Sequence, residues 1–191
     1  MSSAPHRAVV IGASAGGVQA LLALLPALPA DFPWPIFIVL HVPADRSNVL
    51  APLFEAQCGL EVKEAEDKET ARPGVVYFAP SDYHLLVEEN GDLALSSDEA
   101  INYSRPSIDV LFESAADAYG EGLIGVILTG ANNDGAAGLK AVHAAGGVAL
   151  VQDPAAAYAR TMPQAARQAC NTALVLPLDR IADYLKGLER E

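Results

Sequence analysis

RAVVIGASAGGVQALLALLPAL, residues 7–28, is the stretch that decides the fold of this chain. Residues 7–12 are apolar and β-branched, as in a buried strand, and the apolar residues of 17–28 recur at helical spacing. Between them lies a turn made of Gly, Ala and Ser. The pattern predicts a strand, a tight turn and a helix, which together form the first unit of an α/β fold.

The rest of the chain repeats this alternation around one irregular segment. The continuous apolar run at 36–40 is typical of a parallel strand covered on both faces. Further strands are expected at 123–128, 148–151 and 173–176, and further helices at 106–119, 135–145, 163–169 and from 179 onward. We therefore expect a doubly wound, mostly parallel sheet with helices on both faces.

The irregular segment lies between residues 63 and 100, where short apolar runs at 74–79, 84–87 and 93–95 are broken by turns. Asn90-Gly91 between two of these runs is a strong hairpin signal. We predict a small antiparallel excursion at an edge of the sheet. It is too short for a separate domain, so we expect residues 1–191 to form one domain.

Composition excludes several classes of function. The 24 acidic and 12 basic residues give a formal net charge of -12, which repels nucleic-acid phosphates and anionic membranes. The chain shows neither an export signal nor an apolar run of about 18 residues, so we expect a cytoplasmic protein without membrane insertion. Cys58 and Cys170 are far apart and form no metal-binding motif, so neither a disulfide nor a metal site nor a cofactor is expected.

Ser14 lies in the first turn and satisfies the pattern G-x-S-x-G, which can present a serine nucleophile at the carboxyl edge of a sheet. The alternative is that Ser14 caps the following helix. A dinucleotide-binding turn is a further alternative, but it requires glycine at position 14 and an acidic residue at the end of the second strand. That strand is followed by His41.

His41 and Asp134 also follow predicted strands, so three strand ends deliver Ser, His and Asp to the same rim of a parallel sheet. A serine nucleophile needs a general base beside it and a carboxylate that orients this base. Asp134 could instead cap the helix that begins near residue 135. The triad interpretation predicts a contact of about 3 Å between Ser14 and His41.

Several ordered motifs resemble the catalytic domain of chemotaxis protein-glutamate methylesterases, the CheB family. They are IGASAGG at 11–17, HVP at 41–43, PGVVYFAP at 73–80, SRPSIDVLF at 104–112, LTG at 128–130 with NDG at 133–135, and VQDP at 151–154. The resemblance extends from about residue 7 to 186. It implies a serine esterase that hydrolyses glutamyl methyl esters on cytoplasmic chemoreceptor helices, with Ser14 as nucleophile, His41 as base and Asp134 as orienting group. Some members also deamidate receptor glutamines.

The chain departs from the family pattern at Ala15 and at Ala131-Asn132, which border the expected oxyanion hole and substrate entrance. Arg105 matches a cleft region and is a further candidate for substrate binding. The family's receiver domain is not expected, because six residues precede the first strand, so regulation would need a separate receiver protein. A signalling scaffold without catalysis and a nucleotide-binding domain are the alternative functions.

Overall fold

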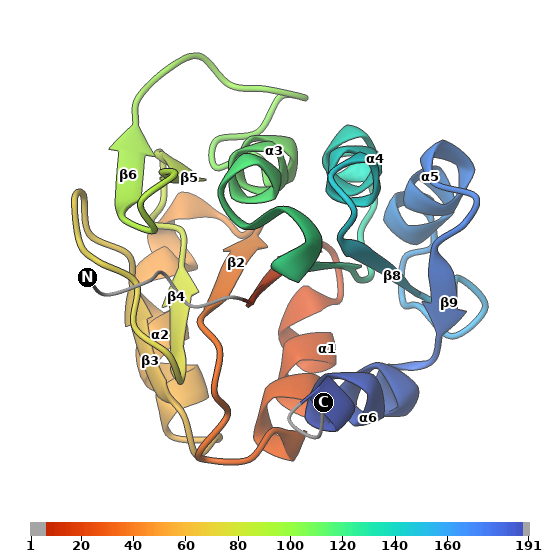
Figure 1. Ribbon diagram of the computed structural model, residues 1–191, viewed down its shortest axis with the longest axis horizontal. Coiled ribbons are helices and arrows are strands. Elements are labelled where there is room, and N and C mark those ends of the chain that lie inside the picture. Colours follow the sequence, from red (N-terminus) through yellow and green to blue (C-terminus); the bar gives the residue numbers. More distant parts are fainter. Residues whose placement is uncertain (1–6, 189–191) are drawn as a thin grey trace.

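The computed structural model describes residues 7–188, and all neighbouring strands of its main sheet pair in parallel. Seven strands lie in the order β3-β4-β2-β1-β7-β8-β9 (Figure 1). They comprise β1 (Ala8–Ala13), β2 (Ile36–Leu40), β3 (Glu61–Glu64), β4 (Val75–Phe78), β7 (Leu123–Ile127), β8 (Val148–Gln152) and β9 (Leu174–Leu176). The predicted doubly wound α/β fold is confirmed.

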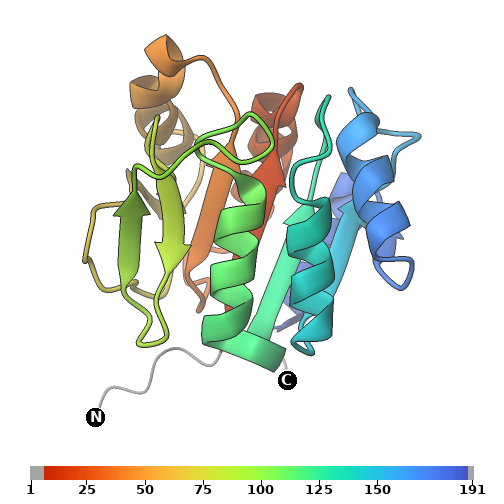
Figure 2. The same ribbon diagram turned by 90° about the horizontal axis from the view of Figure 1, so that it is seen from above.

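Helices cover both faces of this sheet (Figures 1 and 2). One face carries α1 (Gly17–Leu24), α2 (Leu50–Glu55) and α6 (Leu178–Gly187), and the other carries α3 (Ile108–Tyr119), α4 (Ala136–Ala144) and α5 (Thr161–Ala169). Short 3-10 turns follow α1 and precede α2 and β7, at η1 (Leu25–Ala27), η2 (Ala44–Val49) and η3 (Gly120–Gly122).

Strand β1 shows why the apolar runs of the sequence are continuous. Val9, Ile11 and Ala13 pack into the core beneath α1 and α6, whereas Ala8 and Val10 pack into the core beneath α3 and α4. Successive side chains of a strand point to opposite faces, and here both faces are covered. All six residues of β1 are therefore buried.

The antiparallel excursion is confirmed for β5 (His84–Val87) and β6 (Leu93–Ser96), which form a separate two-stranded sheet beside α3 (Figure 2). Our assignment of the run at 74–79 to this excursion is wrong, because β4 pairs in parallel with β2 in the main sheet. The short run carries no local signal for its partner, since strand order depends on contacts distant in sequence. Strand β3 was missed because its sequence, EVKE, is polar at this sheet edge.

Strand order reverses at β1, which has β2 on one side and β7 on the other. In open α/β sheets a ligand crevice lies beyond the carboxyl ends of the strands at such a switch point. The site is therefore expected where β1, β2 and β7 end. Within residues 7–188, no helix combines the length and apolar character needed to cross a membrane.

Candidate active site

Ser14 follows the last residue of β1, in a turn built by backbone contacts. Its N–H donates to the Thr129 carbonyl at 2.9 Å, and its carbonyl accepts from Gly17 N–H at 2.7 Å. Gly16 is the N-cap of α1, with φ 79, and no side chain caps that helix. Within residues 7–188 the Ser14 hydroxyl makes no hydrogen bond, so the helix-cap alternative finds no support.

His41 lies beside Ser14 because of the register between β1 and β2. Ala13 pairs with Leu40, and the His41 N–H continues the ladder by donating to the Ala13 carbonyl at 3.0 Å. The next residue of each strand is therefore Ser14 on β1 and His41 on β2. Neighbouring strands lie about 4.8 Å apart, so the two backbones adjoin at this rim.

The imidazole of His41 lies between two polar partners. Its Nε2 is 3.0 Å from Asp134 Oδ2, and its Nδ1 is 3.3 Å from Asn132 Nδ2. The Nε2–H does not point along the line to the carboxylate, so this close contact is not an aligned hydrogen bond. We expected a contact of about 3 Å between Ser14 and His41. Within residues 7–188, no hydrogen bond joins these two side chains.

Asp134 is completely buried, and in addition to its close contact with His41 its carboxylate accepts hydrogen bonds from several donors. Oδ2 accepts from Ile108 N–H at 2.7 Å, and Oδ1 accepts from Ser107 Oγ at 3.0 Å, Asn102 Nδ2 at 3.0 Å and Asp109 N–H at 3.2 Å. Burial alone would raise the pKa of Asp134, but the contact with His41 and these donors outweigh it and lower the pKa. Asp134 is thus held ionised.

These contacts show that Asp134 does not cap the helix that follows it. Helix α4 has Gly135 as its N-cap, with no side-chain hydrogen bond, whereas Asp134 binds the first N–H groups of α3. Asp109 is the second residue of α3, and its side chain in turn caps α4. It accepts from Gly135 N–H at 3.0 Å and from Gly138 N–H at 2.7 Å. Asp134, which precedes α4, thus caps α3, while Asp109 of α3 caps α4. This exchange of caps fixes Asp134 in front of His41.

Asp109→Ala is expected to destabilise the protein by about 2–4 kcal/mol, because it leaves buried N–H groups of α4 without an acceptor. Burial, followed by the nearby Asp134 charge, raises the pKa of Asp109, and losing that penalty offsets a small part of the effect. Urea unfolding monitored by circular dichroism measures the change. Asp117→Ala, at an exposed position of the same helix, is the control. Equal midpoints for the two variants would contradict the exchange of caps.

Arg105 and Asn132, two predicted substrate contacts, are both engaged within the protein. The Arg105 guanidinium pairs with Asp82 at 2.6 Å and donates to the carbonyls of Ser97 and Asp98. Asn132 Oδ1 accepts from Asp134 N–H at 3.0 Å, while its amide faces His41. The geometry therefore gives Arg105 a bracing role and places Asn132 against the catalytic candidates.

Ala15 and Ala131 lie on either side of the rim, after β1 and β7 respectively. Ala15 is half-buried and its carbonyl accepts from the Thr129 hydroxyl at 2.9 Å, whereas Ala131 is exposed. Among the described residues, the N–H groups of Ala15, Gly16 and Ala131 donate no hydrogen bond. Free backbone N–H groups beside a serine can stabilise an oxyanion.

Asn102, Ser107 and Thr129 support the site without having been predicted to do so. Asn102 and Ser107 donate to Asp134, and Thr129 fixes the turn through its contact with Ala15. Ser107 is the N-cap of α3 in the structure and lies in the first turn of the helix predicted at 106–119, and a serine near a helix start was the one available signal. The partner of each side chain lies far away in sequence, so spacing could not identify it.

A cleft of about 210 Å³ opens beside His41. None of the described residues that line it carries a carboxylate. They are Leu40, His41 and Val42 after β2, Tyr103, Ser104, Arg105 and Pro106 before α3, and Leu50, Ala79 and Ser81. No group of three or more His, Cys, Asp or Glu suited to a metal occurs in residues 7–188.

Comparisons with known proteins identify relatives of this chain and of its fold. The family model described as CheB methylesterase matches residues 9–185. This chain belongs to the CheB methylesterase family. Its fold also matches the crystal structure of the Thermotoga maritima CheB methylesterase catalytic domain, with a TM-score of 0.91 and 38% sequence identity over 95% of this chain and 98% of that one.

Two relatives illustrate the extent of the CheB match. A protein from Leptospira interrogans is 47% identical over 185 residues, covering 97% of this chain and 96% of the relative, and it carries the name protein-glutamate methylesterase/protein-glutamine glutaminase in provisional form. A Myxococcus xanthus protein with that name is 39% identical over 181 residues, covering 93% of this chain and 52% of the relative. The match therefore spans nearly all of one relative and about half of the other.

Proposed function

We propose that this CheB-family chain is a serine esterase that hydrolyses glutamyl methyl esters on the cytoplasmic helices of chemoreceptors. The observation that supports it best is the 3.0 Å approach of His41 Nε2 to the buried Asp134, with Ser14 at the next position on the neighbouring strand. The names of the relatives support the reaction class. The sheet order supports a site at this rim.

In the proposed first step, the Ser14 hydroxyl oxygen attacks the ester carbonyl and its proton passes to His41. Because Nε2 faces the Asp134 carboxylate at 3.0 Å, the nitrogen left to accept the proton is Nδ1. Asn132 occupies Nδ1 at the long distance of 3.3 Å, and the Ser14 hydroxyl replaces it when substrate is bound. His41 then protonates the departing methoxide, which leaves as methanol and gives a glutamyl ester of Ser14.

In the second step a water molecule gives its proton to His41 and attacks the Ser14 ester, and the proton returns to Ser14 as glutamate leaves. Both steps place negative charge on the carbonyl oxygen. We propose the free N–H groups of Ala15, Gly16 and Ala131 as its donors. They belong to the backbone, so replacing side chains at positions 15 and 131 does not remove them.

The same acyl chemistry converts a receptor glutamine to glutamate with release of ammonia, and we include this activity in the proposal. We further propose that residues 1–191 act as a single catalytic domain in the cytoplasm, regulated by a separate receiver protein. A nucleotide-binding role is disfavoured because Ser14 and His41 occupy the positions where that function needs glycine and an acidic residue.

Incubation with a methyl-labelled cytoplasmic receptor fragment is expected to release methanol, and the same fragment with glutamine at the modified positions is expected to release ammonia. Gas chromatography measures the first product and a coupled ammonia assay measures the second. A heat-inactivated sample is the blank. Binding of the fragment without release of either product would favour a scaffold and contradict the proposed function.

A further inference from the structure

Residues 101–104 form a tight turn at the rim of the cleft. Ile101 and Ser104 exchange two backbone hydrogen bonds, at 3.0 and 2.9 Å, and the two residues between them, Asn102 and Tyr103, have φ values of 53 and 61. Positive φ at both central positions defines a type I′ turn, for which Asn followed by Gly is favoured. Tyrosine at the second position is unfavourable because its Cβ crowds the backbone.

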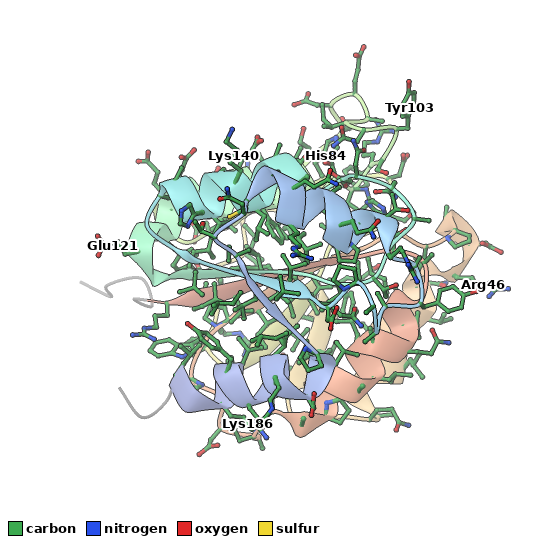
Figure 3. All side chains as sticks on the ribbon, turned by 90° about the vertical axis from the view of Figure 1, so that its right-hand side faces the viewer. Arg46, His84, Tyr103, Glu121, Lys140 and Lys186 are labelled. Atoms are coloured by element: carbon green, nitrogen blue, oxygen red, sulfur yellow. The ribbon has the colours of Figure 1, made fainter. Side chains whose placement is uncertain are left out.

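The two central side chains of this turn lie in opposite environments. Asn102 points inward, and its amide donates to Asp134 at 3.0 Å and to Asp109 at 2.7 Å. Tyr103 is fully exposed, at 105% of its reference accessibility, and lines the cleft together with His41. Figure 3 shows Tyr103 and Arg46 toward the same end of the molecule, away from Glu121.

The turn is braced on the protein, so Tyr103 is presented by an ordered loop. Arg105 ties the segment to Asp82 and to the carbonyls of Ser97 and Asp98. The buried His84 holds it from the other side, with Nε2 2.9 Å from the Glu99 carbonyl oxygen. An exposed aromatic ring on a fixed turn has only its own side-chain torsions to order when a partner covers it, and aromatic residues of this kind dominate binding interfaces.

The size of the cleft determines what must lie against Tyr103. A volume of about 210 Å³ accommodates one side chain, whereas pockets that enclose a whole small molecule measure roughly 300–1,000 Å³. Of the proposed triad, only His41 is among the described residues that line the cleft. A polypeptide that brings its esterified side chain to His41 therefore lies over the rim of the cleft and not inside it. Among the described residues that line the cleft, only Arg105 and a protonated His41 would carry a full charge, and Arg105 is paired with Asp82. This rim therefore suits an apolar contact.

We propose that Tyr103 is a specificity-determining residue that binds the apolar surface of the substrate polypeptide beside the esterified glutamyl residue. This inference rests on the proposed function. Asn102 anchors the same turn to Asp134. The position of the residue that contacts the polypeptide is therefore fixed relative to the carboxylate of the proposed triad. Tyr103 selects a polypeptide ester over a small free ester.

Tyr103→Gly tests this role, because glycine relieves the turn while removing the ring. The value of kcat/KM for a methyl-labelled receptor fragment is expected to fall by about tenfold or more, mainly through KM, as for loss of an interface aromatic. The loss for p-nitrophenyl acetate is expected to be several-fold smaller. The midpoint of thermal unfolding is expected not to fall, and Tyr103→Phe keeps most of the activity on the fragment.

Leu174→Ala, which removes an exposed apolar side chain from β9, is the control and should leave both substrates unaffected. Wild-type kcat/KM of Tyr103→Gly on the fragment would overturn the inference, and so would an equal loss on both substrates. Ser14→Ala separates the two proposals. If it keeps full activity on the fragment, the proposed function fails, whereas a dead Ser14→Ala beside a fully active Tyr103→Gly refutes the role of Tyr103 alone.

Discussion

Ser14→Ala is expected to reduce methanol release from a methylated receptor fragment by about 10⁴-fold or more, with the fold intact. The substitution removes the attacking oxygen, and the nearby Thr129 hydroxyl is engaged with the carbonyls of Ala15 and Ala159. Stability should change little, because within residues 7–188 the Ser14 hydroxyl makes no hydrogen bond and the helix N-cap is Gly16.

The same loss is expected for His41→Ala, and the double variant should be little worse than the more severe single one, since both residues act in one proton transfer. Turnover is measured as methanol release, with circular dichroism as a check on folding. Ser97→Ala is the control, because Ser97 is exposed and braces Arg105 through its carbonyl, which alanine keeps. Wild-type turnover of folded Ser14→Ala would leave Ser14 as a turn residue without a catalytic role.

The arrangement of the sheet was largely predictable from the sequence, because it depends on features of single strands. The runs at 8–13 and 36–40 are apolar without interruption, which indicates coverage on both faces. Parallel strands place their carboxyl ends at one edge, and this alone put Ser14 and His41 on the same rim. The sequence did not predict that residues 75–78 pair in parallel with β2, because a short run between turns carries no information about its partner strand.

The supporting contacts of the site were not predictable, because they join segments distant in the chain. The local pattern suggests that Asp134 caps the helix after it, yet its carboxylate binds the start of α3, and Asp109 caps α4 in return. Arg105 was expected as a candidate for substrate binding, although it pairs with Asp82. Polar side chains of this kind choose partners by tertiary packing, and a single sequence does not encode those distances locally.

Asp134→Ala is expected to lower the free energy of unfolding by about 2–4 kcal/mol at neutral pH, because buried donors of α3 lose a charged acceptor. The pKa of Asp134 is lowered in the folded protein, so this stabilisation is present above the unfolded value of about 3.9 and is lost as pH falls through the folded value. The difference from wild type should therefore shrink in acid. Urea unfolding at pH 7 and pH 3 measures it, and an equal difference at both would contradict the assignment.

Asp134→Asn separates this structural role from catalysis. An amide at position 134 keeps an oxygen in the place of Oδ1 for Asp109 N–H, but its NH₂ group then takes the place of Oδ2 and faces both Ile108 N–H and His41 Nε2. Ile108 N–H loses its acceptor, and Nε2 must become an acceptor. The ring proton moves to Nδ1, the nitrogen that has to receive the Ser14 proton. We therefore expect kcat to fall by about 10³- to 10⁴-fold, somewhat less than for Ser14→Ala, because a minor population of the correct tautomer still reacts. Methanol release measures kcat, with Asp117→Asn on the exposed face of α3 as the control. A fully active, folded Asp134→Asn would mean that the carboxylate only caps α3 and that His41 needs no partner to accept the proton.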